Sequence, residues 1–174
     1  MTARVPADVV AELLAQRGHE LMRVAYVLAP AEAEDLLQGS LVRLLASPGI
    51  AEAENPFGYA KKTIVNEFLD SRRRRDRMLR IRRLVFADGE ISVSEESRYS
   101  DRDALIRAFS GLRPRERACV VLRYYEGYED AEIAEVLGVA RSTVRSLIFR
   151  ALPRLRRALQ SSGFGDRQDG GRGK

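Results

Sequence analysis

Five side chains near the end of the sequence combine positive charge, hydroxyl groups and one aromatic ring. They recur at intervals of three and four residues, which places them on one face of a helix. Guanidinium groups bind phosphate or guanine, hydroxyls bond phosphate or base edges, and a phenyl ring packs on thymine methyls or sugar. The face therefore favours nucleic acid, whereas the alternative is an interdomain contact by the ring beside a solvated arginine surface. The five residues are Ser142, Arg145, Ser146, Phe149 and Arg150.

A second helix and a tight turn precede this face. Residues 130–152 read "DAEIAEVLGVARSTVRSLIFRAL", in which Ile133 and Leu137 hold the first helix to a core and Val144 anchors the second. Gly138 permits the sharp turn between the two helices. This layout predicts a helix-turn-helix, which presents the outer face of its second helix to the major groove of DNA.

Two residues depart from a regular second helix. Ala140 stands at the capping position without a side-chain oxygen, which costs around 1 kcal/mol unless Ser142 caps a shorter helix. Pro153 lacks the amide hydrogen that would bond the Phe149 carbonyl, and its ring clashes there. We therefore predict a kink or an end of the helix near Leu152, followed by a separately directed turn.

Charge is distributed along the chain in blocks. The sequence has 30 basic and 25 acidic side chains, a net charge of +5. Residues 71–87 have eight arginines and one acid, residues 104–160 have a net charge of +5, and residues 88–103 have a net charge of −4. Contact with a polyanion is therefore expected at the two basic blocks and not at the acidic segment between them.

The residues that usually carry catalysis or bind metals are scarce. The single cysteine, Cys119, and the single histidine, His19, exclude an internal disulfide and a metal site rich in cysteine or histidine. Cys119 lies in an apolar run and is expected to be buried rather than reactive. No phosphate-binding glycine loop, apolar run long enough to cross a bilayer or secretory signal is visible. We therefore expect a cytoplasmic protein that is not an enzyme, with no metal, cofactor or membrane insertion.

Helical periodicity dominates the sequence, and strand signals are almost absent. The predicted fold class is all-α, with two small helical bundles joined by a flexible acidic linker and the helix-turn-helix in the second bundle. The first bundle covers residues 5–83, the linker 84–101, the second bundle 102–160 and a disordered tail 161–174. Helices are expected at 8–17, 19–28, 32–46, 56–75, 103–112 and 114–127, before the two helices of the helix-turn-helix. The helix at 114–127 is expected to bury Ala118, Val121, Leu122 and Tyr125.

Three stretches, in this order, resemble the sigma-70 family of bacterial sigma factors. "AEAEDLLQGSLVRLL" (31–45) is similar to the family's helix that binds the polymerase clamp, and "NPFGYAKKTIVNEFLDSRRRR" (55–75) is similar to its promoter −10 segment. Leu112 to Leu152 looks like the family's promoter −35-binding domain. The chain is most similar to the short extracytoplasmic-function group, which has only two conserved domains. The resemblance implies a dissociable subunit that gives core RNA polymerase its promoter choice.

By this resemblance, the clamp-binding helix would meet the coiled coil of the polymerase β′ clamp through Asp35, Leu36 and Gln38. Gly39 stands where an acidic residue is usual, which weakens the helix by roughly 1 kcal/mol relative to alanine. The family pattern would also place the −35 DNA contacts on one group of residues, with Arg123 holding phosphate. The group is Arg123, Arg141, Ser142, Thr143, Arg145, Ser146, Phe149 and Arg150.

The −10 segment would hold a base pulled from the DNA stack, with the loop Ser47–Asn55 and the following helix lining its pocket. Asn66 could read a base edge, while Lys61 and Lys62 could hold phosphates. Tyr59 stands where the family usually has tryptophan, and it stacks on the base or belongs to the core.

The run "RRRRDRMLRIRR" after the −10 segment is a solvated helix end, a phosphate-binding arm or a polymerase contact. Asp70, just before it, is expected to pair with nearby arginines. The family's partners are core RNA polymerase (β′ clamp and β flap), promoter DNA and, in some members, an anti-sigma factor. Two alternatives stay open: a helix-turn-helix transcription regulator acting without polymerase core, and a sigma factor lookalike that has lost promoter melting.

Overall fold

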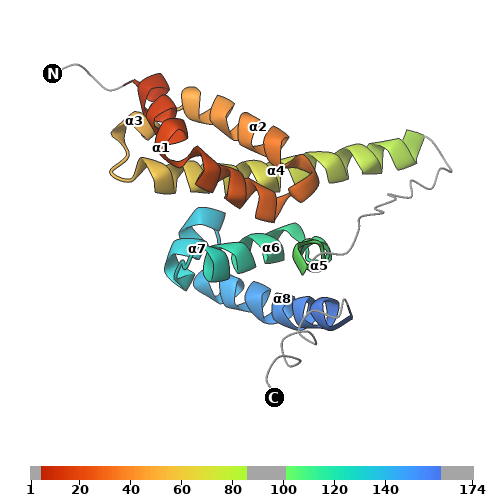
Figure 1. Cartoon of the computed structure of the whole chain (residues 1–174). Coiled ribbons are helices and arrows are strands. Elements are labelled where there is room, and N and C mark those ends of the chain that lie inside the picture. Colours follow the sequence, from red (N-terminus) through yellow and green to blue (C-terminus); the bar gives the residue numbers. More distant parts are fainter. Residues whose placement is uncertain (1–4, 86–100, 162–174) are drawn as a thin grey trace, which may run out of the picture.

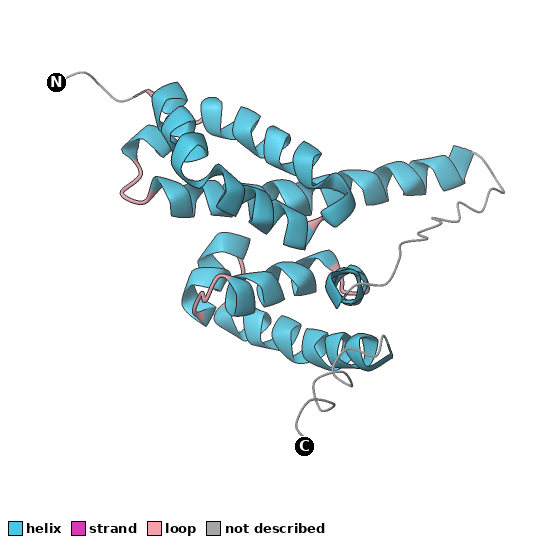
Figure 2. Cartoon of the chain, viewed as in Figure 1, coloured by secondary structure: helices cyan, strands magenta, loops and turns pink. Residues whose placement is uncertain are grey.

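The computed structural model describes residues 5–85 and 101–161, and every regular element in these two ranges is a helix (Figure 1, Figure 2). This confirms the predicted all-α class, while the predicted linker and tail lie almost entirely outside the described residues. The first range contains α1 (Pro6–Leu28), η1 (Pro30–Glu32), α2 (Ala33–Leu45), α3 (Gly49–Glu52) and α4 (Pro56–Val85). The second range contains α5 (Asp101–Ser110), α6 (Pro114–Val120), η2 (Val121–Tyr125), α7 (Asp130–Leu137) and α8 (Arg141–Ser161).

The first bundle packs α1, α2 and α4 around one core. The two helices predicted at 8–17 and 19–28 are joined end to end in α1, with a non-helical residue at Arg17 (φ −135°, ψ 17°). Both halves of α1 bury apolar side chains, so the bend lets one helix follow the core along its whole length. The most deeply buried large residues of this bundle include Leu21, Leu28, Leu44, Ile64 and Phe68.

α4 continues to Val85 instead of ending near Arg75 as predicted. Arginine, leucine and methionine favour helix, and no glycine or proline interrupts the extension. The extension passes beyond the bundle (Figure 1), and its Met78 and Ile81 are exposed. The sequence prediction ended too early because the apolar periodicity stops where the helix leaves the core.

The second bundle contains a π-helical turn, η2, between α6 and the helix-turn-helix. The amide of Glu126 bonds the Val121 carbonyl at 3.1 Å, five residues back. The wider turn rotates Tyr125 away from the core, so the prediction that this ring is buried is wrong. Gly127 (φ 73°) and Gly138 (φ 61°) both adopt the left-handed conformation that ends a helix, and Gly138 makes the sharp turn predicted for it.

α8 runs through Pro153 as one helix, so the end predicted near Leu152 is wrong. The Phe149 carbonyl, which loses its helical partner, belongs to an exposed residue, where water can replace the missing bond. Contacts beside the proline hold the helix in place. Ala151 is fully buried, and Arg154 forms an ion pair at 2.9 Å with a buried carboxylate of α6.

The two bundles pack against each other and share one continuous apolar core. α6 and α7 contact α4, and α5 contacts α1 (Figure 1). Arg117 of α6 is 7 % exposed and donates a hydrogen bond to the Leu28 carbonyl, at the end of α1, at 2.8 Å. Its guanidinium lies 5.7 Å from the centre of the Phe68 ring. Burial and the nearby Arg72 lower the pKa of Arg117 to about 10, so it stays charged at neutral pH.

Candidate nucleic-acid interface

The outer face of α8 is open to solvent. Its five nucleic-acid candidates are all exposed and, together with Thr143, line a broad, shallow hollow. α8 lies on the side of the second bundle that faces away from the first (Figure 1). Phe149 is 79 % exposed, which excludes the alternative that its ring forms an interdomain contact. An exposed phenyl ring among arginines and hydroxyls suits a surface that binds a large partner.

The start of α8 matches the spacing expected of a recognition helix. Arg141 is its first residue, and Thr143 lies half-buried at the rim of the exposed face. The Ala140 carbonyl accepts the amides of Thr143 at 3.0 Å and Val144 at 3.2 Å, so Ala140 directly precedes the helix. The helix is therefore not a shorter one capped by Ser142.

Asp130 of α7 restrains two of the predicted DNA-binding arginines. It accepts a hydrogen bond from Arg145 at 2.9 Å and pairs with Arg123, which also lies 3.4 Å from Glu129. The hydrogen bond from Arg145, reinforced by the charge of Arg123, holds the pKa of Asp130 below its usual value. Sequence reasoning missed Asp130, because its contact with Arg145 crosses 15 residues and the turn of the helix-turn-helix.

The predicted polymerase-binding residues divide into two kinds. Asp35 and Gln38 are exposed on α2, so they can reach a partner. Leu36 is 6 % exposed and packs in the core of the first bundle, where it holds the helix in place.

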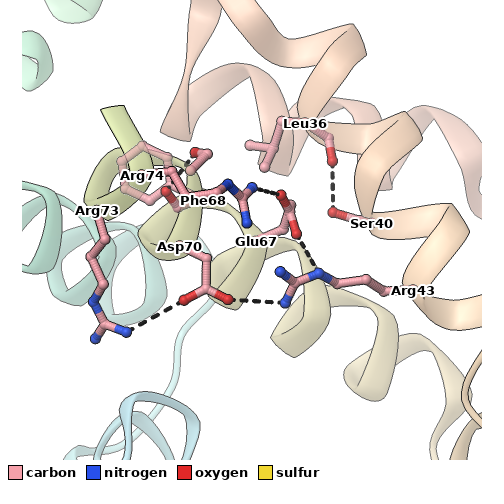
Figure 3. A network of polar contacts seen from close by, with 9 residues as sticks. Leu36, Ser40, Arg43, Glu67, Phe68, Asp70, Arg73 and Arg74 are labelled. Atoms are coloured by element: carbon pink, nitrogen blue, oxygen red, sulfur yellow. Dashed lines mark hydrogen bonds and ion pairs between the residues drawn. The ribbon is translucent and has the colours of Figure 1, made fainter. Parts of the chain in front are cut away.

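A network of charged side chains joins α2 to α4 (Figure 3). Arg43 of α2 pairs with Glu67 and, at 3.0 Å, with Asp70, both of which lie on α4. Glu67 is buried and also pairs with Arg74 at 2.5 Å, while Asp70 lies 3.4 Å from Arg73. Asp70 is therefore a structural partner of arginines, which confirms the prediction made for it.

Gly39 lies directly beside this network. A Cβ atom at residue 39 would lie 3.6 Å from the Glu67 carboxyl group, which is an ordinary contact. An acidic side chain there would bring a second carboxylate close to Glu67, and the two like charges would repel. Gly39 therefore stands in place of the family's usual acidic residue at a point where Glu67 of α4 already supplies a carboxylate.

The segment before α4, predicted as a loop but containing the short helix α3, is tied to α4 by Tyr59. The Tyr59 hydroxyl lies 2.7 Å from the Ser47 hydroxyl, and a Cβ at Gly49 would come within 3.1 Å of it. Tyr59 is half-buried, so part of its side chain packs against the core and part stays accessible. Asn55 accepts a hydrogen bond from the Gly58 amide at 2.9 Å and so caps the start of α4.

The two lysines of the −10 segment face the second bundle. Lys61 pairs with Glu126, and only 12 % of the lysine side chain and 11 % of the glutamate side chain are exposed. Lys62 lies 3.5 Å from Glu135 of α7 and is more accessible. Asn66, one turn further along α4, is half-buried. Sequence reasoning missed both glutamates, since the contacts form only when the two bundles pack.

Within the described residues, no group of acidic, histidine and cysteine side chains could hold a metal ion, and no helix is long and apolar enough to cross a membrane. Cys119 is fully buried, as predicted. Burial raises the pKa of its thiol to about 12, so the thiol is protonated at neutral pH.

Comparison with known proteins links both bundles to one family. Residues 108–157 match the family model of sigma-70, region 4. The chain is 33% identical to an RNA polymerase sigma-E factor of Streptomyces avermitilis, over 86% of this chain and 84% of that protein. It is 35% identical to the ECF RNA polymerase sigma factor SigE of Mycolicibacterium smegmatis, over 83% of this chain and 59% of that protein.

A solved structure has the same fold. It is the sigma factor RpoE from Bartonella quintana in complex with the anti-sigma factor NepR, and the similarity covers 86% of this chain and 96% of that chain. The TM-score is 0.65 and the sequence identity is 24%.

Proposed function

The chain belongs to the extracytoplasmic-function group of the sigma-70 family of bacterial RNA polymerase sigma factors, and from this premise we propose which surfaces perform its steps. It is an initiation factor that binds core RNA polymerase and directs promoter recognition, melting and transcription initiation. As a regulatory subunit it works in the cytoplasm, where the polymerase is, and has no catalytic site of its own. Residues 5–83 form the polymerase-binding and −10 domain, and residues 102–160 form the −35 domain.

The −35 surface consists of Arg123 and the predicted residues of α8. The exposed face of α8 is the observation that carries this assignment, because the major groove of B-DNA admits an α-helix and this face carries hydrogen-bond donors at successive turns. Arg145 reads a base edge, since its side chain is 75% exposed and its pairing with Asp130 through Nε leaves the other guanidinium nitrogens without a partner in that pair. Arg123 holds a phosphate at the edge. The −35 surface is Arg123, Arg141, Ser142, Thr143, Arg145, Ser146, Phe149 and Arg150.

The −10 surface consists of Tyr59, Lys61, Lys62 and Asn66 on α4. The two ammonium groups hold phosphates of the separated strand, and the Asn66 amide bonds a base edge. The Tyr59 hydroxyl is hydrogen-bonded to Ser47, at the start of the segment before α4. From this position the ring can stack on an unpaired base.

The polymerase-binding surface consists of Asp35 and Gln38 on α2, which meet the β′ clamp. Leu36, buried beneath them, keeps the helix in position. The second bundle is the part of the chain that meets the β flap. An anti-sigma factor is a further partner, proposed because the structurally similar RpoE is bound to the anti-sigma factor NepR.

In vitro transcription tests the proposal. The purified chain is added to sigma-free core polymerase with a pool of genomic promoter fragments, and the 5′ ends of the RNA are sequenced. Discrete start sites that share two upstream motifs about two DNA turns apart would support the assigned roles. Binding to core without initiation would indicate that promoter melting is lost. Absence of binding to core would favour a helix-turn-helix regulator that acts without the polymerase.

A further inference from the structure

A cleft between three helices is lined by five arginines, here called the arginine cleft. α6 lies between α4 and α8 (Figure 1), and all three helices contribute side chains to the cleft. We propose that the arginine cleft binds a diphosphate group, as free pyrophosphate or as the diphosphate of a nucleotide. The inference needs neither DNA nor polymerase, so it does not depend on the proposed function. The five residues are Arg72, Arg73, Arg113, Arg115 and Arg150.

The arginines of the cleft come from both bundles. Arg72 and Arg73 belong to α4, whereas the other three belong to the second bundle. Packing of the two bundles therefore brings like charges towards each other, and like charges repel. A bound polyanion would attract arginines from both sides and offset this repulsion.

The two arginines of α4 are held in place by neighbouring side chains. Arg72 pairs with Glu32 at 3.1 Å, and its guanidinium lies 5.4 Å from the centre of the Phe68 ring. Arg73 lies 3.4 Å from Asp70. These contacts fix the first-bundle wall of the cleft before any ligand arrives, which lowers the entropy that binding costs.

The three arginines of the second bundle lack acidic partners. In the ranges 5–85 and 101–161, no carboxylate forms an ion pair with Arg113, Arg115 or Arg150. Arg150 donates a hydrogen bond from Nε to the Ser146 carbonyl at 3.1 Å, which leaves its charge uncompensated. All three side chains are exposed, so an anion from solution can reach them.

Two carboxylates also line the cleft, and they do not balance its charge. Glu116 is 1% exposed and pairs with Arg154 at 2.9 Å, so its charge is already matched. Asp76 of α4 is exposed and opposes the three unpaired arginines with a single negative charge. The cleft therefore keeps an excess of positive charge.

The size and floor of the cleft suit a small polyanion. Its volume is about 290 Å³, just below the roughly 300–1,000 Å³ of pockets that hold whole drug-sized ligands. Leu69 and Leu147 are both buried beneath the charged rim, and apolar surroundings strengthen the attraction between opposite charges. A guanidinium binds two phosphate oxygens at once, so arginines on three helices favour two linked phosphates over one.

Isothermal titration calorimetry of the full chain with pyrophosphate tests this inference, at constant ionic strength because salt screens such contacts. The test variant is Arg113→Gln combined with Arg115→Gln. The control is Arg156→Gln combined with Arg157→Gln, which removes the same charge from the same bundle at exposed side chains that do not line the cleft. Arg150 is left unchanged because it also belongs to the proposed −35 surface.

The unchanged chain should bind pyrophosphate saturably at one site. The test variant should bind it at least about tenfold more weakly, while the control should change the affinity by less than about twofold. Absence of saturable binding by the unchanged chain would overturn the inference. So would an equal loss in the control, because the effect would then come from net charge alone.

A third variant changes the affinity in the opposite direction. Asp76→Asn removes the exposed carboxylate of the cleft and should tighten pyrophosphate binding by about two- to threefold. A gain of affinity cannot result from misfolding, so this variant guards against a trivial loss in the test variant. Unchanged or weaker binding would place the pyrophosphate outside the cleft and overturn the inference.

Other phosphate compounds identify the form of the ligand. Inorganic phosphate should bind more weakly than pyrophosphate, and equal affinities would overturn the choice of a diphosphate group. ADP that binds as tightly as pyrophosphate, with the same loss in the test variant, would support a nucleotide as the source. Binding of pyrophosphate without ADP would support the free anion. If the test variant loses affinity for duplex DNA and the unchanged chain does not bind pyrophosphate, the cleft holds the DNA backbone and the inference is wrong.

Discussion

The −35 and −10 surfaces differ in where their basic side chains find their acidic partners. Arg145 and Arg123 of the −35 surface pair with Asp130 inside their own bundle. Lys61 and Lys62 of the −10 surface pair with glutamates of the other bundle. The arginines of the first surface lie on an exposed face, whereas Lys61 of the second surface is covered and Lys62 is partly exposed.

This difference shows that an ion pair can prepare a binding site or close it, depending on which part of the fold supplies the partner. A partner within the same bundle limits the rotamers of a side chain and moves with it. A partner in the other bundle restrains the side chain only while the two bundles remain packed. The ion pairs of Lys61 and Lys62 therefore depend on the interface between the bundles, and those of Arg145 and Arg123 with Asp130 do not.

The largest expected effect comes from removing the link between the bundles at Arg117. Arg117→Ala should lower the free energy of unfolding by about 2–3 kcal/mol, because the Leu28 carbonyl loses its donor and a void remains over Phe68. The unpaired Nε of Arg117 makes its burial costly and limits this loss. Urea denaturation measures the change.

The matched control is Arg115→Ala, an exposed arginine on the same helix. It should change the free energy of unfolding by less than about 0.5 kcal/mol. If both variants lose the same stability, Arg117 does not hold the bundles together. The −10 surface would then no longer be distinguished from the −35 surface by its dependence on the packing of the two bundles.

The next effect concerns the −35 surface alone. Arg145→Ala should weaken binding to −35 duplex by about 1–3 kcal/mol and blur the preference at one or two base pairs, because a base-edge contact is lost. Competition binding against a set of single-base variants measures this. Arg156→Ala, on the exposed far end of α8, serves as the control and should leave the base preference unchanged. Equal weakening for every sequence would mean that Arg145 holds phosphate.

A smaller effect is expected at the polymerase-binding helix. Gly39→Ala should raise the free energy of unfolding by about 0.5–1 kcal/mol, because alanine is the better helix former and its Cβ fits at 3.6 Å from Glu67. Gly39→Glu should gain less, since a second carboxylate would face Glu67. Thermal unfolding of the two variants compares them. A loss of stability in Gly39→Ala would mean that the network in Figure 3 tolerates no side chain at this position.

The smallest expected effect on stability comes from the thiol of Cys119, which can be followed by its chemical reactivity. Its pKa of about 12 lies above the ordinary value of 9.0, so the folded chain holds the thiol proton more tightly than the unfolded chain. The contribution of this pKa difference to the free energy of unfolding is fully present below about pH 9 and is lost as the pH rises towards 12. Iodoacetamide at pH 8 should therefore not label the folded chain and should label it fully in urea. Rapid labelling of the folded chain would show that the core opens readily at this residue.

Local patterns in the sequence predicted much of the fold. Helical periodicity placed most helices, and Gly127 and Gly138 marked helix ends through their tolerance of positive φ. The prediction was wrong at Pro153, where core contacts beside the proline outweigh the lost hydrogen bond. It was also wrong at Tyr125, because a π-helical turn adds a residue that no periodicity reveals.

The sequence by itself determined the residue types of the two proposed DNA-binding surfaces and the helices that carry them. These depend on spacing within a helix, which is a local property of the chain. Only the tertiary structure decided that Asp130 meets Arg145 and that Glu126 meets Lys61, the second across 65 residues. The physical reason is that side-chain pairing acts over a few ångströms, and only the packing of helices brings distant segments that close.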